Sequence, residues 1–277
     1  MGTFYKDNSE IPFVGNKIDL EFLPSLLDED IRPAALDLQA RMEPRLYYLL
    51  LATSGSGKTS AITDLGRLIY IQYIAMQFRN SLTLELPTSD DSLVRKSNYE
   101  FARNQFMIEV LCRLLQLYRL FQNHPHLTPF DYFIHQRNVG DEWVRKLRSE
   151  LKNLSAESCI DLFGIYRNKL EPVLKDKKLV ISIDEIEAAA HDGVGSYDYD
   201  YDRKNPAKNR GLLSPMIAGL TELEEAGNFS VVLTGTASPF DRKSSVRSSI
   251  NTEDALVVVK DIVNNFPLVT KKACVKF

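Results

Sequence analysis

An apolar run that passes directly into a Gly- and Ser-rich stretch most restricts how this chain can fold. Residues 46–51 read LYYLLL, residues 52–60 read ATSGSGKTS, and the sequence continues as AITDLGRL. The apolar run has the length and density of a central strand buried on both faces of a parallel sheet. We expect a helix to begin at Gly57 or Lys58. A strand, a Gly-rich turn and a helix in this order predict backbone N–H groups around a concave anion site.

The same stretch follows the phosphate-loop pattern G-x-x-x-x-G-K-[ST], with Ala52 in place of the first glycine. Gly55 and Gly57 let the backbone approach phosphates closely, Lys58 reaches the β- and γ-phosphates, and the Thr59 hydroxyl binds Mg²⁺. The alternative is an ordinary turn before a surface lysine. We predict that ATP and Mg²⁺ are held by Ala52, Thr53, Ser54, Gly55, Ser56, Gly57, Lys58, Thr59 and Ser60.

A second apolar run, LVISIDE at 179–185, ends on two acids. At the carboxyl edge of a parallel sheet, Asp184 is placed to complete the Mg²⁺ shell, because this ion prefers oxygen ligands. Glu185 follows as the catalytic residue that orients, or accepts a proton from, the water attacking the γ-phosphate. The alternative is a strand that simply runs into a solvated turn.

Two further residue types are candidates for contact with the γ-phosphate. The run VVLTGT at 231–236 is expected beside the first two strands, so Thr234 or Thr236 could reach the phosphate or the attacking water. A strand-end threonine that satisfies local backbone groups is the alternative. Phosphoryl transfer also benefits from a guanidinium. Of the arginines that follow these strands we name Arg210 as the candidate, although Arg242, Arg247 or none of them could serve.

The remaining segments predict an α/β fold. Residues 1–44 form an N-terminal lead-in packed on the core, with a helix at RPAALDLQARM, and residues 45–277 form the core. A second strand within 69–78 is expected beside the first, and residues 87–98 are expected as loop. Residues 99–174 form a helical insertion, 191–210 a long polar loop, and 211–227 a helix closed by Gly227. Residues 254–269 read as helix or strand.

Composition restricts the function classes. The 277 residues are 44% hydrophobic and 26% charged, which is typical of a globular protein. A formal net charge of −3 provides no global basic field, so charge does not indicate nucleic-acid binding. The sequence has no run near the roughly 18 apolar residues of a membrane span. Cys112, Cys159 and Cys274 lack metal-ligand spacing and read as thiols in a reducing compartment. We expect an intracellular protein, cytoplasmic or nuclear.

Three segments together carry a family resemblance: LLATSGSGKTSAITDLG, LVISIDE and VVLTGTASPF. They resemble the P-loop ATPase module of Crinkler-type proteins of fungi and oomycetes, which is similar to AAA+ and STAND ATPases. The resemblance spans roughly residues 45–270. It implies ATPase activity and a helical lid after FPLVTKK, which this sequence would have only in part. It also implies, from some family members, a secreted effector that acts in host nuclei.

These patterns predict an α/β P-loop NTPase, a three-layer sandwich with a mainly parallel sheet. Hydrolysis of ATP would drive or time a conformational or assembly switch, with a homo-oligomer or another protein as partner. Two alternatives stay open at this stage. One is an ATP-binding scaffold or effector with negligible hydrolysis, and the other is a small-molecule phosphotransferase.

Overall fold

The computed structural model describes residues 30–31, 33–44, 47–52, 58–76, 91–137, 141–174, 178–193, 196–197, 211–236 and 259–261. Within these ranges the strands form one sheet in the order β2-β3-β4-β1-β5, and every neighbouring pair is parallel. The predicted α/β class with a parallel sheet is therefore confirmed. The strands are β1 Tyr47–Ala52, β2 Tyr70–Ala75, β3 Leu179–Asp184, β4 Ser230–Thr236 and β5 Val259–Asp261.

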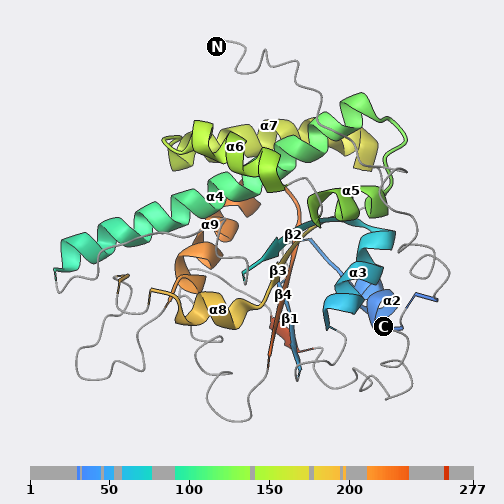
Figure 1. Cartoon of the computed structure of the whole chain (residues 1–277), viewed down its shortest axis with the longest axis horizontal. Helices are drawn as coiled ribbons and strands as arrows, with labels where there is room; N and C mark the ends of the chain where they lie inside the picture. Colours follow the sequence, from blue (N-terminus) through green and yellow to red (C-terminus); the bar gives the residue numbers. More distant parts are fainter. Residues whose placement is uncertain are drawn as a thin grey trace.

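Helices cover both faces of this sheet, which is compatible with a three-layer sandwich (Figure 1). Helices α2 and α3 lie on one side, and α8 and α9 lie on the other, where α4, α6 and α7 also pack. The predicted insertion thus supplies much of one helical layer. The helices are α2 Pro33–Arg41, α3 Lys58–Leu68, α4 Ser92–Asn123, α5 Pro129–His135, α6 Asp141–Leu151, α7 Ala156–Leu174, α8 Ile186–His191 and α9 Leu213–Ala226.

Alternation along the strands divides the core into two clusters. In β3, Ile181 and Ile183 join the cluster beneath α4, α7 and α9, whereas Val180 joins the cluster beneath α2 and α3. Successive side chains of a strand point to opposite faces, so a strand buried on both faces reads as a continuous apolar run. This explains why the apolar runs of β1, β3 and β4 could be recognised in the sequence.

The position of β2 differs from the prediction. We expected β2 beside β1, but β2 pairs with β3, from Tyr70↔Leu179 to Ala75↔Asp184. Likewise, β4 lies beside β1 as expected but not beside β2, because β3 separates them. Neighbours in sequence are often neighbours in a sheet. Here the chain passes through α3 to the far end of the described sheet before it returns through β3 and β4.

Helix α4 begins earlier than predicted. Asp91 is its N-cap and accepts a hydrogen bond from the Leu93 N–H, so residues 92–98 are helical rather than loop. The polar residues spaced three or four apart along α4 are themselves buried: Gln105, Glu109, Arg113 and Gln116. A polar stripe at this spacing usually faces solvent, whereas here Gln105 donates to the Lys152 carbonyl just after α6 and Glu109 contacts Arg148 of α6.

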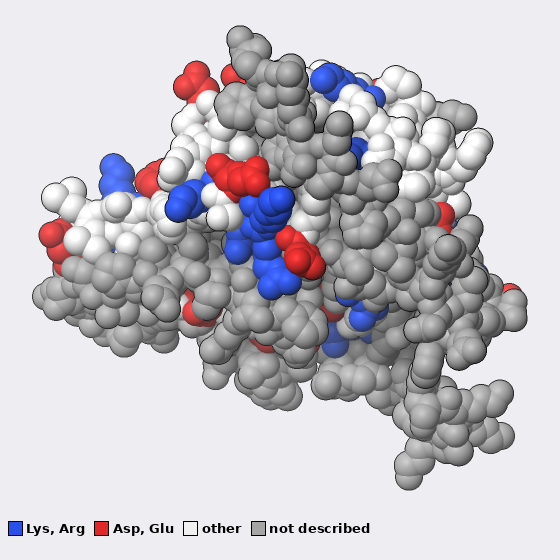
Figure 2. All heavy atoms as spheres, turned by 45° about the horizontal axis from the view of Figure 1, so that its top comes forward, with Lys and Arg blue, Asp and Glu red and all other residues white. Residues whose placement is uncertain are grey.

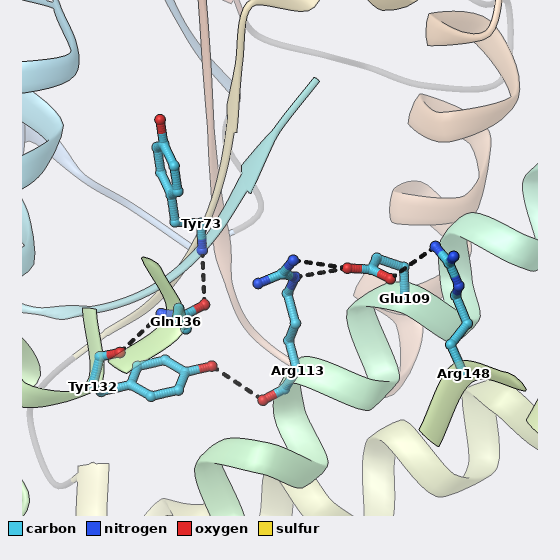
Figure 3. A network of polar contacts seen from close by, with 6 residues as sticks. All are labelled: Tyr73, Glu109, Arg113, Tyr132, Gln136 and Arg148. Atoms are coloured by element: carbon cyan, nitrogen blue, oxygen red, sulfur yellow. Dashed lines mark hydrogen bonds and ion pairs between the residues drawn. The ribbon is translucent and has the colours of Figure 1, made fainter. Parts of the chain in front are cut away.

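Glu109 lies at the centre of those contacts. Its carboxylate accepts from Arg113 of the same helix at 2.9 Å and from Arg148 of α6 at 3.3 Å (Figure 3). Glu109 is fully buried, and a carboxylate in such a place requires charged partners. Glu109 and its two arginine partners therefore join α6 to α4.

The sequence did not predict two short helices. Helix α5 starts with Pro129 after a capping box between Thr128 and Asp131, a local signal for a helix start rather than for a break. Helix α8 follows Glu185 directly. Within the expected polar loop, Tyr197 is buried, and Ser196 is buried and accepts from the Asn98 amide through its backbone carbonyl at 2.9 Å. Residues 259–261 of the ambiguous C-terminal segment are the strand β5.

Other sequence predictions concern the thiols, the membrane and the lead-in. Cys112 and Cys159 are buried free thiols, while Cys274 lies outside the described residues. Within the described ranges, every helix is too short or too polar to cross a lipid bilayer. Helix α2, from the predicted lead-in, packs on α3 and buries Leu38 in the cluster it shares with that helix.

Candidate functional site

The carboxyl ends of the strands meet at one edge of the sheet. The pairs Ala52↔Thr236 and Ala75↔Asp184 join the last residues of four strands. Helix α3 follows β1 on one face, and α8 and α9 follow β3 on the opposite face. In open α/β sheets, ligands bind beyond the carboxyl ends where the connections change faces. The predicted site residues that the structure describes lie at this edge.

Asp184 is the centre of the site and is only 5% exposed. Its Oδ2 accepts from the Tyr73 hydroxyl at 2.7 Å and from the Thr59 hydroxyl at 3.0 Å. Its Oδ1 accepts from the Thr234 hydroxyl and from the Glu185 N–H. An ionised carboxylate has about four acceptor positions. Donors from β2, α3, β4 and the following residue therefore fix the orientation of this carboxylate.

Lys58 is the first residue of α3 and is buried. Burial lowers the pKa of its ammonium group, and the carboxylates of Glu187, Asp184 and Glu185 oppose that shift. The ammonium group therefore lies within electrostatic range of the acids that follow β3. Lys58 and Asp184, which the sequence predicts at one site, are brought together.

Glu185 has a left-handed backbone, with φ 61° and ψ 47°. Among the described residues it alone has a positive φ without being glycine. Burial raises the pKa of its carboxyl group, and Asp184 and Glu187 add to the rise while Lys58 opposes it. Its Oε2 is buried without a hydrogen-bond partner in the structure. Strained backbone and perturbed carboxyl groups are both typical of functional sites.

The remaining predicted residues are only partly described. Ala52 ends β1 and Thr236 ends β4, but their side chains lie outside the described set. Ser60 is half-buried in the first turn of α3. Thr234, the other candidate threonine, donates its hydroxyl hydrogen to Asp184. The predicted residues outside the described ranges are Thr53, Ser54, Gly55, Ser56, Gly57, Arg210, Arg242 and Arg247.

Tyr73 is a site residue that sequence reasoning missed. Its hydroxyl reaches Asp184 because β2 lies beside β3, with Tyr73 opposite Ser182. Its ring packs edge-on against Phe133, with centroids 5.5 Å apart, and the Arg137 guanidinium lies 5.6 Å from the ring centroid. The sequence carries no local signal for this role, because strand order alone decides it.

The oxygen atoms of Asp184 and Thr59 are ligands of the kind that a hard divalent cation prefers. Thr59 donates its hydroxyl hydrogen to Asp184, which leaves the lone pairs of its oxygen available. Mg²⁺ takes oxygen ligands and is usually bound through one or two carboxylates, phosphates and retained waters rather than an all-protein cage. Searched over the described residues alone, the structure has no group of three or more His, Cys, Asp or Glu placed to hold a metal. The residues that could hold Mg²⁺ are thus Thr59 and Asp184.

Among the described residues on the face that Figure 2 draws, surface charge singles out no other site. There the Lys and Arg side chains of the described residues lie beside Asp and Glu side chains. This mixture is in keeping with the formal net charge of −3.

No protein-family model matches the sequence, and a search of curated proteins found no match either. The function proposed below is therefore supported by the residues and their geometry.

Proposed function

We propose that the chain binds Mg²⁺-ATP and hydrolyses the γ-phosphate, as a P-loop ATPase whose hydrolysis drives or times a conformational or assembly switch. One observation carries this proposal. The Thr59 hydroxyl, at the start of the helix after the Gly-rich stretch, donates to Asp184 at 3.0 Å across 125 residues of sequence. The sequence predicts both residues at one cation, Asp184 because a phosphate loop needs an acid at the end of a neighbouring strand.

Each residue in the proposal has a chemical role. The backbone amides of residues 53–57 and the Lys58 ammonium bind phosphate oxygens. Thr59 and Asp184 would hold Mg²⁺, which would neutralise negative charge on the phosphates. Glu185 orients the attacking water and accepts its proton. The raised pKa of Glu185 supports this role, since a general base is most effective when its pKa approaches the working pH.

Glu185 also favours hydrolysis over the scaffold alternative. A purely structural residue at this position has no reason to combine a left-handed backbone with a carboxyl group whose ionisation is disfavoured. The Crinkler-type assignment, the effector role and a trans-acting arginine such as Arg210 rest on sequence motifs and stay predictions.

The first experiment compares nucleotide binding and phosphate release in two variants. Lys58→Ala should weaken Mg²⁺-ATP binding about 100-fold, because a charged hydrogen bond contributes up to about 3 kcal/mol. Glu185→Gln should bind as wild type and lose at least about 100-fold in kcat, the usual contribution of a general base. Binding is measured by calorimetry and turnover by release of inorganic phosphate.

The matched controls are Glu142→Gln, in α6, and Lys152→Ala, just after it. Both positions are exposed, and neither change should alter nucleotide binding or turnover. Absence of ATP binding by the wild type would refute the proposal. Binding without any turnover would establish the scaffold, and a phosphorylated acceptor in place of free phosphate would establish a phosphotransferase. Turnover per chain that rises with protein concentration would point to an oligomer with an arginine supplied in trans.

A further inference from the structure

Tyr73 connects the outermost described strand to the centre of the site. Strand β2 ends the strand order of the sheet, and the Tyr73 hydroxyl donates to Asp184 Oδ2 at 2.7 Å. Thr59 donates to the same oxygen at 3.0 Å. Tyr73 is therefore the partner of Oδ2 that belongs to neither predicted motif.

The end of α5 and the two residues after it hold Tyr73 in place. The Gln136 side chain accepts from the Tyr73 N–H at 3.0 Å (Figure 3). It also donates to the Ile71 carbonyl at 2.6 Å, so it binds the outer edge of β2. Phe133 packs edge-on against the Tyr73 ring, and Arg137 lies over it. Backbone and ring of Tyr73 are thus both fixed by residues 133–137.

We infer that Tyr73 is a positioning residue that holds Asp184 in the orientation required to bind the Mg²⁺ of the nucleotide complex. The inference rests on the proposed function. Mg²⁺ demands nearly ideal octahedral geometry, so a freely rotating carboxylate binds it poorly. Hydrogen-bond partners of metal ligands commonly contribute 10–100-fold in metal affinity, because they fix ligand orientation.

A second tyrosine of the same strand provides a matched comparison. Tyr70 lies three residues earlier and is buried, and its hydroxyl donates to the Leu127 carbonyl at 2.8 Å. That hydrogen bond joins β2 to the segment between α4 and α5 and does not touch the site. Tyr70→Phe and Tyr73→Phe each remove one hydroxyl from β2, and only Tyr73→Phe removes a donor to Asp184.

The experiment measures binding of the non-hydrolysable analogue AMP-PNP to the full chain, first in EDTA and then during titration with Mg²⁺ or Mn²⁺. In Tyr73→Phe the metal concentration at half-saturation should rise about 10-fold, as for other partners of metal ligands. Binding in EDTA should stay within about twofold of wild type, since the phosphate contacts are assigned to residues 53–58. Electron paramagnetic resonance of Mn²⁺ provides an independent measure of bound metal. Tyr70→Phe should titrate as wild type.

Arg137→Ala, at an exposed position, is the second variant and should give a smaller rise, because the ring of Tyr73 loses one of its contacts. A wild-type metal titration in Tyr73→Phe would overturn the inference and leave the proposed function intact. Tighter metal binding in Tyr73→Phe would also overturn it, since the hydroxyl would then compete with the cation for Oδ2. Failure of the wild type to bind AMP-PNP at all would overturn the proposed function and, with it, the inference.

Discussion

At the scale of single residues, Glu185 combines two unfavourable features. Its left-handed backbone, at φ 61°, costs an L-residue other than glycine about 1–2 kcal/mol. Its carboxyl group lies near Asp184 and Glu187, and burial adds to their effect in raising its pKa. Both features reduce stability at neutral pH, and in the proposed reaction they would keep a proton acceptor at the site. Natural proteins commonly accept this trade between stability and function.

The pH dependence of the free energy of unfolding should show the raised pKa of the Glu185 carboxyl group. Because the pKa of Glu185 is raised in the folded state, its contribution to stability is complete below its ordinary value of 4.5 and is lost as the pH rises through the folded value. Glu185→Gln should therefore be more stable than wild type at pH 7, and this advantage should vanish toward pH 4. Urea unfolding measured between pH 4 and pH 7 checks this difference in stability. An advantage that is independent of pH would contradict the assignment.

Glu185→Gly in the same experiment isolates the contribution of the left-handed backbone to the free energy of unfolding. Glycine adopts positive φ freely but loses more conformational entropy on folding, so the net gain over Glu185→Gln should be about 0.5–1 kcal/mol. This increment should be the same at every pH, because neither variant carries a carboxyl group. A Gly variant less stable than the Gln variant would show that the left-handed backbone carries no strain.

At the scale of elements, the outer edge of β2 is closed by a side chain. The Gln136 amide bonds both the Tyr73 N–H and the Ile71 carbonyl, as a neighbouring strand would. Exposed strand edges promote pairing with other chains, and proteins cover them with helices, loops or charges. Gln136 is itself buried at the end of α5, so this helix covers the edge and supplies hydrogen bonds to it.

Gln136→Met should destabilise the protein by about 2 kcal/mol, because it preserves side-chain length and leaves two backbone groups without partners. Urea unfolding gives the free energy, and hydrogen exchange should show faster exchange at the Tyr73 amide. Gln122→Met, at an exposed position of α4, is the control and should change stability by less than about 0.5 kcal/mol. An unchanged Tyr73 amide in Gln136→Met would contradict the role of this side chain.

The elements differ in how far local sequence determines them. Strand β1, helix α3 and the end of β3 were predicted because a buried strand, a Gly-rich turn and an apolar run with terminal acids are local patterns. The capping box of α5 and the Asp91 N-cap of α4 are local too, and these signals were present but overlooked. The place of β2 was wrong because strand order depends on long-range packing. Tyr73 could not be assigned to the site for the same reason.

At the scale of the whole molecule, two free thiols among the described residues can be used to detect opening of the helical layer opposite α3. Cys112 of α4 and Cys159 of α7 are fully buried in the cluster that β1, β2, β3 and β4 share with those helices. Burial raises the pKa of the Cys159 thiol to about 12, and burial and nearby Glu109 raise that of Cys112 well above its ordinary value. Since thiolates are the reactive form, both should react only when this layer opens.

Nucleotide binding should then slow the labelling of these thiols, provided that they become exposed by cooperative unfolding of sheet and helices together. A ligand that binds only the folded state stabilises it by about 2.7 kcal/mol at 100 times its Kd, which corresponds to about 100-fold slower labelling when reclosing is fast. The measurement uses Cys274→Ser, so that the thiol outside the described residues does not contribute, with and without Mg²⁺-AMP-PNP. Lys58→Ala in the same background should show at most about twofold protection, because its binding is about 100-fold weaker. Protection confined to one cysteine, or absent from both while the analogue is bound, would show that the layer of α4 and α7 opens independently of the site. The sheet would then not couple the nucleotide to the helices that cover it.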